Sequence, residues 1–262
     1  MAQSGALYHR IAADLREEIH SGQLPPGARL PTEQEISTSY GVSRNTVRLA
    51  LAALANEGSI TSIPGRGTFV RERILTTYHA SWAESRDRMA SDQGDAYRNE
   101  LHAQGRNPTY RDFQMRIIAA TAEHAARLGV EEGTALVLRS LARHVDGQPS
   151  SLQDSYYPMD LAQECGLLTP HDIPGGTIRA MAEAGHAEIG YRDEITTRMP
   201  TPDEANTLRL GSGVPVLVYA RTTYTKTRPA RLTLTVFAGD QNRIVYELGD
   251  LAAYTAIGDD HQ

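Results

Sequence analysis

Two helix signals separated by a short turn lie in the first quarter of the chain, and their spacing constrains the fold more than any other feature. Thr32, with Glu35 three residues later, forms a capping box, which predicts a helix start. Gly41 is suited to end that helix in the left-handed conformation. Ser43 predicts the N-cap of a further helix that runs to about Asn56. Two helices joined by so short a turn form a helix-turn-helix.

The segments on either side complete a small domain. In residues 7–21 an apolar side chain recurs every four residues, which predicts a helix before the pair. After the pair, β-branched residues predict short strands at 59–63 and 68–70, and a glycine-rich hairpin at 64–67 joins them. The sequence therefore predicts three helices followed by a two-stranded hairpin.

The second helix of the pair has an apolar side and a polar side. A helix with arginine and asparagine on its exposed arc suits the major groove of DNA, where Arg bonds guanine and Asn bonds adenine. The alternative, a charged side that is merely solvated, stays open on the helix alone. Arg66 in the hairpin favours DNA, because the glycines around it let backbone amides approach a phosphate. At 100° per residue the packing stripe is Val47, Ala50, Leu51 and Leu54, and the polar arc is Arg44, Asn45 and Arg48.

The net charge of −6 argues against a nucleic-acid partner for the chain as a whole. The charge is unevenly spread, however. Residues 1–73 hold 8 Lys or Arg and 7 Asp or Glu, whereas residues 74–262 hold 18 and 25. The nearly neutral first part is compatible with a local DNA-binding surface.

Composition limits the class of protein. With 262 residues the chain has room for two domains, and 40% apolar residues exclude a disordered or fibrous chain. No run of 18 apolar residues is present, and acidic residues interrupt the N-terminus, so we expect neither a membrane span nor a signal peptide. Cys165 is the single cysteine, which favours a reducing compartment and a packed thiol. We expect a cytoplasmic protein.

The remainder of the chain mixes strands and helices. Residues 72–92 are polar and indicate a linker, partly helical around 82–89. The fold class that we predict is α+β, with a mostly antiparallel sheet after the N-terminal helices. The expected strands are 110–118, 136–145, 151–157, 188–199, 214–225, 231–237 and 242–248, and the expected helices are 97–104, 122–128, 178–184 and 202–210.

The motifs LPTE, GVSRNTVR, EG and GRGTFV between Leu7 and Val70 resemble the winged helix-turn-helix of the GntR family of bacterial transcription regulators. The family commonly has Arg where this chain has Gln34, so a phosphate or base contact is lost there. The resemblance implies that Arg44, Thr46 and Arg48 contact or position DNA, that Ser43 bonds phosphate, and that Gly65, Arg66 and Gly67 form the tip of the wing.

A second resemblance covers about residues 93–250. The segments LRSLARHVDGQP (138–149), SYYP (155–158) and RTTY (221–224) are similar to the UTRA effector domain of the HutC subfamily, which has the chorismate-lyase fold. The expected organisation is a winged helix-turn-helix over 1–74, a linker over 75–92, a UTRA-like effector and dimerisation domain over 93–250, and a tail over 251–262.

The second resemblance also implies the effector-binding residues. Leu141 stands where the subfamily has an arginine, and Gln153 and Arg231 stand where it has carboxylates. Because two acids are lost, we expect an anionic or partly apolar effector instead of an amino-sugar phosphate, with Arg143 as its anchor. The alternative is that Arg143 pairs with a surface acid. The implied contacts are Tyr97, Arg98, Leu141, Arg143, Gln153, Arg231 and Phe237, and strand alternation adds Arg139 to the face of Leu141 and Arg143.

The two resemblances together imply a ligand-responsive transcriptional regulator, expected to be a repressor that binds a palindromic operator as a homodimer. We expect no cofactor, and no catalytic residue, since nothing forms a nucleophile elbow. The nine histidines show no metal-ligand spacing, so no metal is expected. Two alternatives remain: a constitutive DNA-binding protein whose effector pocket does not function, and an enzyme with a chorismate-lyase-like domain.

Overall fold

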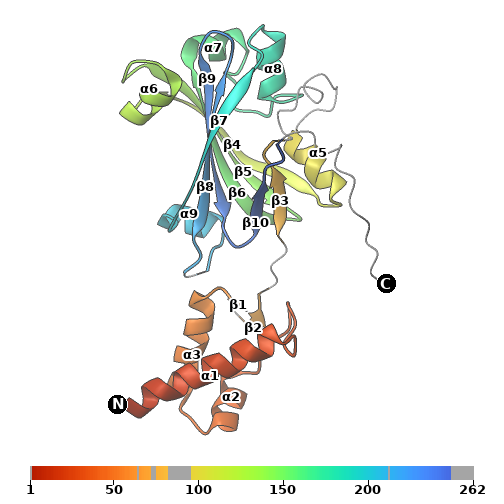
Figure 1. Cartoon of the computed structure of the whole chain (residues 1–262), viewed down its shortest axis with the longest axis vertical. Helices are drawn as coiled ribbons and strands as arrows, with labels where there is room; N and C mark the ends of the chain where they lie inside the picture. Colours follow the sequence, from red (N-terminus) through yellow and green to blue (C-terminus); the bar gives the residue numbers. More distant parts are fainter. Residues whose placement is uncertain (1, 64, 72–74, 82–95, 212, 249–262) are drawn as a thin grey trace. The chain divides into compact units, whose positions relative to one another are not determined.

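The computed structural model describes residues 2–63, 65–71, 75–81, 96–211 and 213–248 (Figure 1). The chain divides into two compact units. The first comprises Met1–Leu75, Thr196–Val218 and Phe237–Gln241, and the second comprises Thr76–Ile195, Tyr219–Val236 and Asn242–Gln262.

The N-terminal region has the predicted element order. Its helices are α1 (Ala2–His20), α2 (Glu33–Tyr40) and α3 (Arg44–Asn56). The strands β1 (Ile60–Ile63) and β2 (Gly67–Val70) pair antiparallel. Three helices and a hairpin are therefore confirmed.

Local signals set the ends of these helices. The Thr32 hydroxyl accepts from the backbone N–H of Glu35, and the Glu35 carboxylate accepts from that of Thr32, so the capping box is confirmed. Gly41 ends α2 with φ of 62°. The Ser43 hydroxyl accepts from the N–H of Thr46 at the start of α3. The start of α2 is thus fixed by the capping box, and the turn of the helix-turn-helix by left-handed Gly41 and the Ser43 cap.

The core of this region lies where the three helices meet. The predicted packing stripe of α3 is confirmed, since Val47, Ala50 and Leu54 are fully buried and Leu51 packs against them. Ile11 of α1 joins the same cluster. Burial of these side chains leaves the other side of α3 exposed.

A six-stranded sheet dominates the rest of the chain, with the order β4-β5-β6-β9-β8-β7. The pairs β4–β5 and β5–β6 are antiparallel, as predicted. The strands are β4 (Pro108–Ala119), β5 (Ala135–Val145), β6 (Gln148–Pro158), β7 (Gly190–Arg198), β8 (Val216–Tyr224) and β9 (Pro229–Ala238). The helices are α5 (Ala96–Ala103), α6 (Ala122–Leu128), α7 (Met159–Glu164), α8 (Thr177–Glu183) and α9 (Pro202–Thr207).

The predicted linker and last strand differ from the structure. Within 72–92, which the sequence predicts as a polar linker, the structure has β3 (Thr76–His79), and β3 pairs in parallel with β10 (Asn242–Val245). The two strands form a separate sheet. The prediction failed because β3 is only four residues long and three of them are buried, so it shows no polar–apolar alternation. The expected helix at 82–89 and the tail at 251–262 lie outside the described residues.

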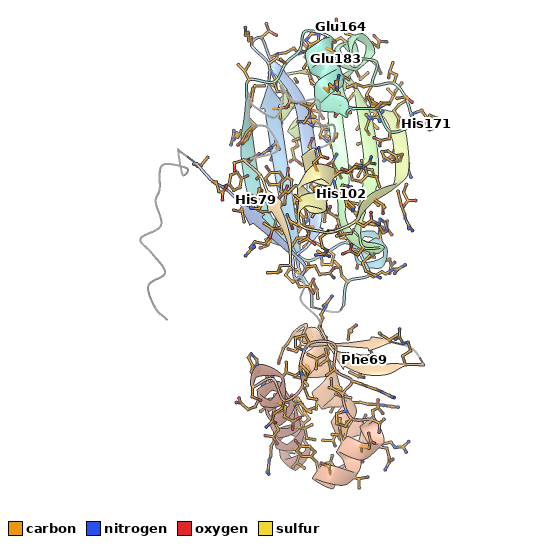
Figure 2. All side chains as sticks on the ribbon, turned by 90° about the vertical axis from the view of Figure 1, so that its right-hand side faces the viewer. Phe69, His79, His102, Glu164, His171 and Glu183 are labelled. Carbon is orange, nitrogen blue, oxygen red and sulfur yellow. The ribbon has the colours of Figure 1, made fainter. Side chains whose placement is uncertain are left out.

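The two faces of the large sheet are covered differently (Figure 1). Leu128 of α6 packs with Leu136 and Leu138 of β5 on one face. Alternate residues of β5 point to the opposite face, which α5 and β3 cover (Figure 2). In the described part of the chain, no helix is long and apolar enough to span a membrane.

Candidate functional site

The outer side of α3 presents the predicted polar arc to solvent. Arg44, Asn45 and Arg48 are all exposed, whereas Val47 between them is fully buried. The first two lie in the first turn of the helix, where the N-terminal end of the helix dipole also attracts phosphate. The arc therefore offers donors for base edges and for the DNA backbone.

Two side chains of α2 hold these arginines in the free protein. Gln34 accepts a hydrogen bond from Nε of Arg44 at 2.9 Å. Glu33 accepts from Nε of Arg48 at 3.0 Å, with side chains 39% and 68% exposed, respectively. An ion pair this exposed contributes little to stability. Both arginines can therefore leave Gln34 and Glu33 and bind DNA with little loss of folding stability.

Ser43 and Thr46 have a different environment. Thr46 is only 7% exposed, and its hydroxyl lies 2.9 Å from that of Ser43. The Ser43 side chain is exposed but is engaged in capping α3. Thr46 therefore helps to hold the N-cap of α3 and is too buried to contact DNA directly. Of the two residues, only Ser43 has a side chain that phosphate can reach.

The hairpin carries a cluster of cations. Arg66 is exposed at its tip, beside Gly65 with φ of 72°. Gly67 has φ of 115°, and a Cβ there would lie 2.9 Å from Nε of Arg29, so the guanidinium of Arg29 crosses the base of the wing. Arg29 is exposed and makes a β-bridge to Phe69, which Figure 2 labels on this hairpin. Sequence reasoning did not single out Arg29, because its position beside Gly67 arises only in the fold.

A polar layer covers one face of the large sheet. The β5–β6 register sets Arg143 opposite Ser151, Leu141 opposite Gln153, and Arg139 opposite Ser155. Residues directly opposite one another share a face, so the predicted Leu141, Arg143 and Gln153 come together. Arg143 donates to Oε1 of Gln153, and the amide nitrogen of Gln153 donates to Ser155 at 3.2 Å. The layer continues onto β9, where the hydroxyl of Thr233 lies 3.2 Å from that of Ser155.

The helix α5 and the strand β3 lie over this layer. The guanidinium carbon of Arg143 is 4.1 Å from the centre of the Tyr97 ring on α5, a cation–π contact. Tyr97 in turn stands 6.2 Å from the ring of Tyr78 on β3. Figure 2 shows His79 on β3 and His102 on α5 in front of the sheet. The buried carboxylate of Glu100 joins the two elements, because it accepts from the backbone N–H of His79 at 2.7 Å.

Arg139 lies on the same face as Arg143 but makes different contacts. Its guanidinium donates to three backbone carbonyls, those of Leu167, Thr169 and His171. Burial lowers the pKa of Arg139. Its role in the free protein is to hold the loop after α7.

The other predicted effector residues have partners of their own. Arg98 pairs with Asp172 at 3.0 Å and stacks on Tyr110. Arg231 pairs with Glu188 at 2.9 Å, and both side chains are buried. Phe237 is fully buried on β9. The sequence places Arg231 where related proteins have a carboxylate. In the structure, the carboxylate of Glu188 pairs with Arg231.

One buried ion pair was missed from the sequence. Arg221 on β8 makes two hydrogen bonds to Asp193 on β7, at 2.7 and 2.8 Å, and donates to the carbonyl of Ala80 just after β3. The hydroxyl of Tyr246 also donates to Asp193, and burial raises the pKa of Tyr246 to about 12. The acid and the base are 28 residues apart in the sequence, and no local pattern links them.

Metal-ligand geometry and the single cysteine can be assessed in the described residues. No group of three or more His, Cys, Asp or Glu side chains in the described ranges is arranged to hold a metal ion. Cys165 is buried in an apolar cluster, where burial raises the pKa of its thiol. The prediction of a packed thiol is confirmed.

Comparison with protein families supports the two-part architecture. Residues 7–70 match the model for bacterial regulatory proteins of the gntR family, and residues 103–243 match the UTRA domain. The chain belongs to the GntR family. Its helix-turn-helix and its large sheet are therefore the DNA-binding and UTRA domains of such a regulator.

Transcriptional regulators are similar to this chain over nearly their whole length. The HTH-type transcriptional repressor NagR of Bacillus subtilis is 28% identical, over 94% of this chain and 96% of its own. An uncharacterised HTH-type transcriptional regulator of Rhizobium meliloti is 31% identical, over 92% and 95%. A crystal structure described as a GntR-family transcriptional regulator has a TM-score of 0.63 and 28% identity, covering 93% of this chain and 97% of that one. The protein is a DNA-binding transcriptional regulator that responds to a ligand.

Proposed function

We propose that the GntR-family protein is a repressor that binds a palindromic operator as a homodimer and leaves it when a small anionic effector binds. The observation that carries the DNA-binding part is the exposed arc of Arg44, Asn45 and Arg48. Arg66 on the wing adds a phosphate contact beside it. The similarity to NagR, a named transcriptional repressor, supports repression over activation.

The effector would act by shifting a population of dimer geometries. A dimer binds two half-sites about 34 Å apart when its recognition helices match successive major grooves. An effector that binds better to a dimer with another spacing lowers operator affinity. A coupling of about 1–3 kcal/mol changes that affinity roughly 5–150-fold.

An anionic effector is supported by the environment of Arg143. Its guanidinium is held by Gln153 and lies on the ring of Tyr97, two neutral groups that fix its direction. A guanidinium fixed in this way can bind a carboxylate or phosphate through two hydrogen bonds. Leu141 in the next row leaves an apolar contact for the rest of the effector.

The proposal includes the organisation of the chain. The DNA-binding domain is 1–74 and the effector and dimerisation domain is 93–250, followed by a tail over 251–262. Within the predicted linker 75–92, β3 joins the effector domain through its pairing with β10. We expect no catalysis in this domain, and we expect the protein to act in the cytoplasm, where a bacterial operator lies.

Recovery of genomic DNA by the purified protein tests this function. The expected result is a small set of fragments that share an inverted repeat, and the genes beside them indicate the class of effector. A thermal-shift screen of related metabolites then separates a sensor from a constitutive repressor, because a bound ligand stabilises the protein by RT ln(1 + [L]/Kd). Fragments without a shared repeat would contradict the proposal, and turnover of a metabolite by the protein would favour the enzyme instead.

A further inference from the structure

Ser151 on β6 belongs to the polar layer of the large sheet. The β5–β6 register sets it directly opposite Arg143, one row from Gln153. Directly opposite residues of an antiparallel pair project from the same face. The hydroxyl of Ser151 therefore projects from the same face of the sheet as the Arg143 side chain.

The Ser151 hydroxyl is fully buried, with 0% exposure, and among the described residues it has no hydrogen-bond partner. Nearby serines are all satisfied. Ser155 lies 3.2 Å from Thr233, and Ser140 donates to Asp154. A buried hydroxyl that makes no hydrogen bond destabilises the folded protein, so its presence calls for an explanation such as a ligand.

The strand geometry explains how Ser151 reaches this place. The register changes between Arg143, which pairs with Ser151, and His144, which pairs with Pro149. Ser150 is the extra residue, and its hydroxyl donates to Asn242 of β10 at 3.0 Å. Bulges of this kind change the direction in which a side chain points. The bulge thus satisfies Ser150 elsewhere and leaves Ser151 opposite Arg143.

We propose that Arg143 and Ser151 form a two-point anchor for a carboxylate of the effector. The guanidinium donates to the carboxylate through its fork, and the hydroxyl donates one more hydrogen bond. Gln153 positions the guanidinium and is itself engaged with Ser155. A carboxylate has two oxygens, which suits this small number of donors better than the three oxygens of a phosphate. The inference rests on the proposed effector function and gives it a chemical class.

The experiment measures thermal unfolding of the full chain with increasing succinate or inorganic phosphate, against chloride at the same ionic strength. The variants are Ser151→Ala, Arg143→Ala and a matched control, Ser140→Ala, on the other face of β5. Succinate is expected to stabilise the wild type. Ser151→Ala should raise the succinate concentration of half-maximal effect about tenfold or more, since a hydrogen bond to a charged group is lost. Ser140→Ala should leave that concentration unchanged.

A second readout separates a ligand contact from a structural role. Without succinate, Ser151→Ala should unfold at the same temperature as the wild type or higher, because it removes a hydroxyl that bonds nothing in the free protein. A clear loss of stability there would overturn the proposal. So would a half-maximal succinate concentration within twofold of the wild type, or stabilisation by phosphate alone. If Arg143→Ala abolishes the succinate effect and Ser151→Ala does not, the two-point anchor fails while the anionic effector stands. If neither variant changes the effect, both fail.

Discussion

Arg48 on α3 and Arg221 on β8 both face a carboxylate at hydrogen-bonding distance, yet their settings differ. The pair of Arg48 with Glu33 is 68% and 39% exposed, and one nitrogen, Nε, donates to both carboxylate oxygens at 3.3 and 3.0 Å. The pair of Arg221 with Asp193 is 4% and 9% exposed, and two nitrogens take part. Solvent competes for the first pair, whereas burial shields the second from solvent. An arginine and a carboxylate therefore form an exchangeable contact on the DNA-binding surface and a fixed one between β7 and β8 of the sheet.

The largest expected effect is on the buried pair. Arg221→Met should destabilise the protein by about 3–5 kcal/mol, because it leaves Asp193 buried without its cation. The measurement is chemical denaturation followed by circular dichroism. Arg48→Met is the matched control and should change stability by less than about 1 kcal/mol.

A further variant sharpens this contrast. Replacing both partners in Arg221→Met with Asp193→Leu should restore part of the lost stability, since no charge then stays buried alone. A single Arg221→Met variant as stable as the wild type would contradict the distinction between the two pairs.

The next effect concerns DNA affinity. Arg48→Ala should weaken operator binding by about 1–3 kcal/mol per protomer and relax the base preference at one position of each half-site. A gel-shift titration with the operator and single-base variants measures this. Unchanged affinity would mean that Arg48 does not leave Glu33 for DNA.

Arg66→Ala should have a smaller effect that is similar for all sequences. The loss of one phosphate contact should flatten the dependence of log K on log salt by about one unit. Titrations of a random duplex at several salt concentrations measure this slope. A loss confined to one base position, with the slope unaltered, would instead make Arg66 a base contact.

The smallest effect is on pH dependence. The backbone N–H and the hydroxyl of Thr32 hold the pKa of Glu35 below its ordinary value. A carboxylate with a lowered pKa contributes stability above its unfolded pKa, and this contribution is lost as the pH falls below about 4. Glu35→Gln should therefore lose less stability than the wild type between neutral and acid pH. Equal losses would show that the capping box does not set the acid response of α2.

What the sequence predicts well is local. Thr32, Glu35, Gly41 and Ser43 act within four residues of the backbone groups they bond, so the caps of α2 and α3 follow from residue type. Apolar periodicity gave the buried side of α3. Once the packing stripe of α3 is buried, its remaining side, with Arg44, Asn45 and Arg48, is exposed.

What the sequence does not predict is long-range pairing. Arg231 forms an ion pair with Glu188, 43 residues away in the sequence. No local sequence pattern predicts such a contact. Arg139 shares the face of Arg143 but donates to the loop after α7, because that loop brings carbonyls within its reach. The strand β3 (Thr76–His79) pairs with β10 (Asn242–Val245), which is far from it in the sequence. These contacts join residues that are distant in the sequence, so the effector side was harder to predict than the DNA side.

We propose that the exposed arginines of α3 and the wing bind DNA, while the buried arginines of the sheet stabilise the fold. The most direct test is the salt dependence of binding to a duplex recovered from the genome, for the wild type, Arg48→Ala and Arg66→Ala. We expect a steep fall of log K with log salt in the wild type, with a slope reduced by about one in Arg66→Ala. We also expect Arg48→Ala to show a smaller preference for this duplex over a random one. Equal slopes and equal preferences in all three proteins would show that these arginines do not bind DNA in the proposed way.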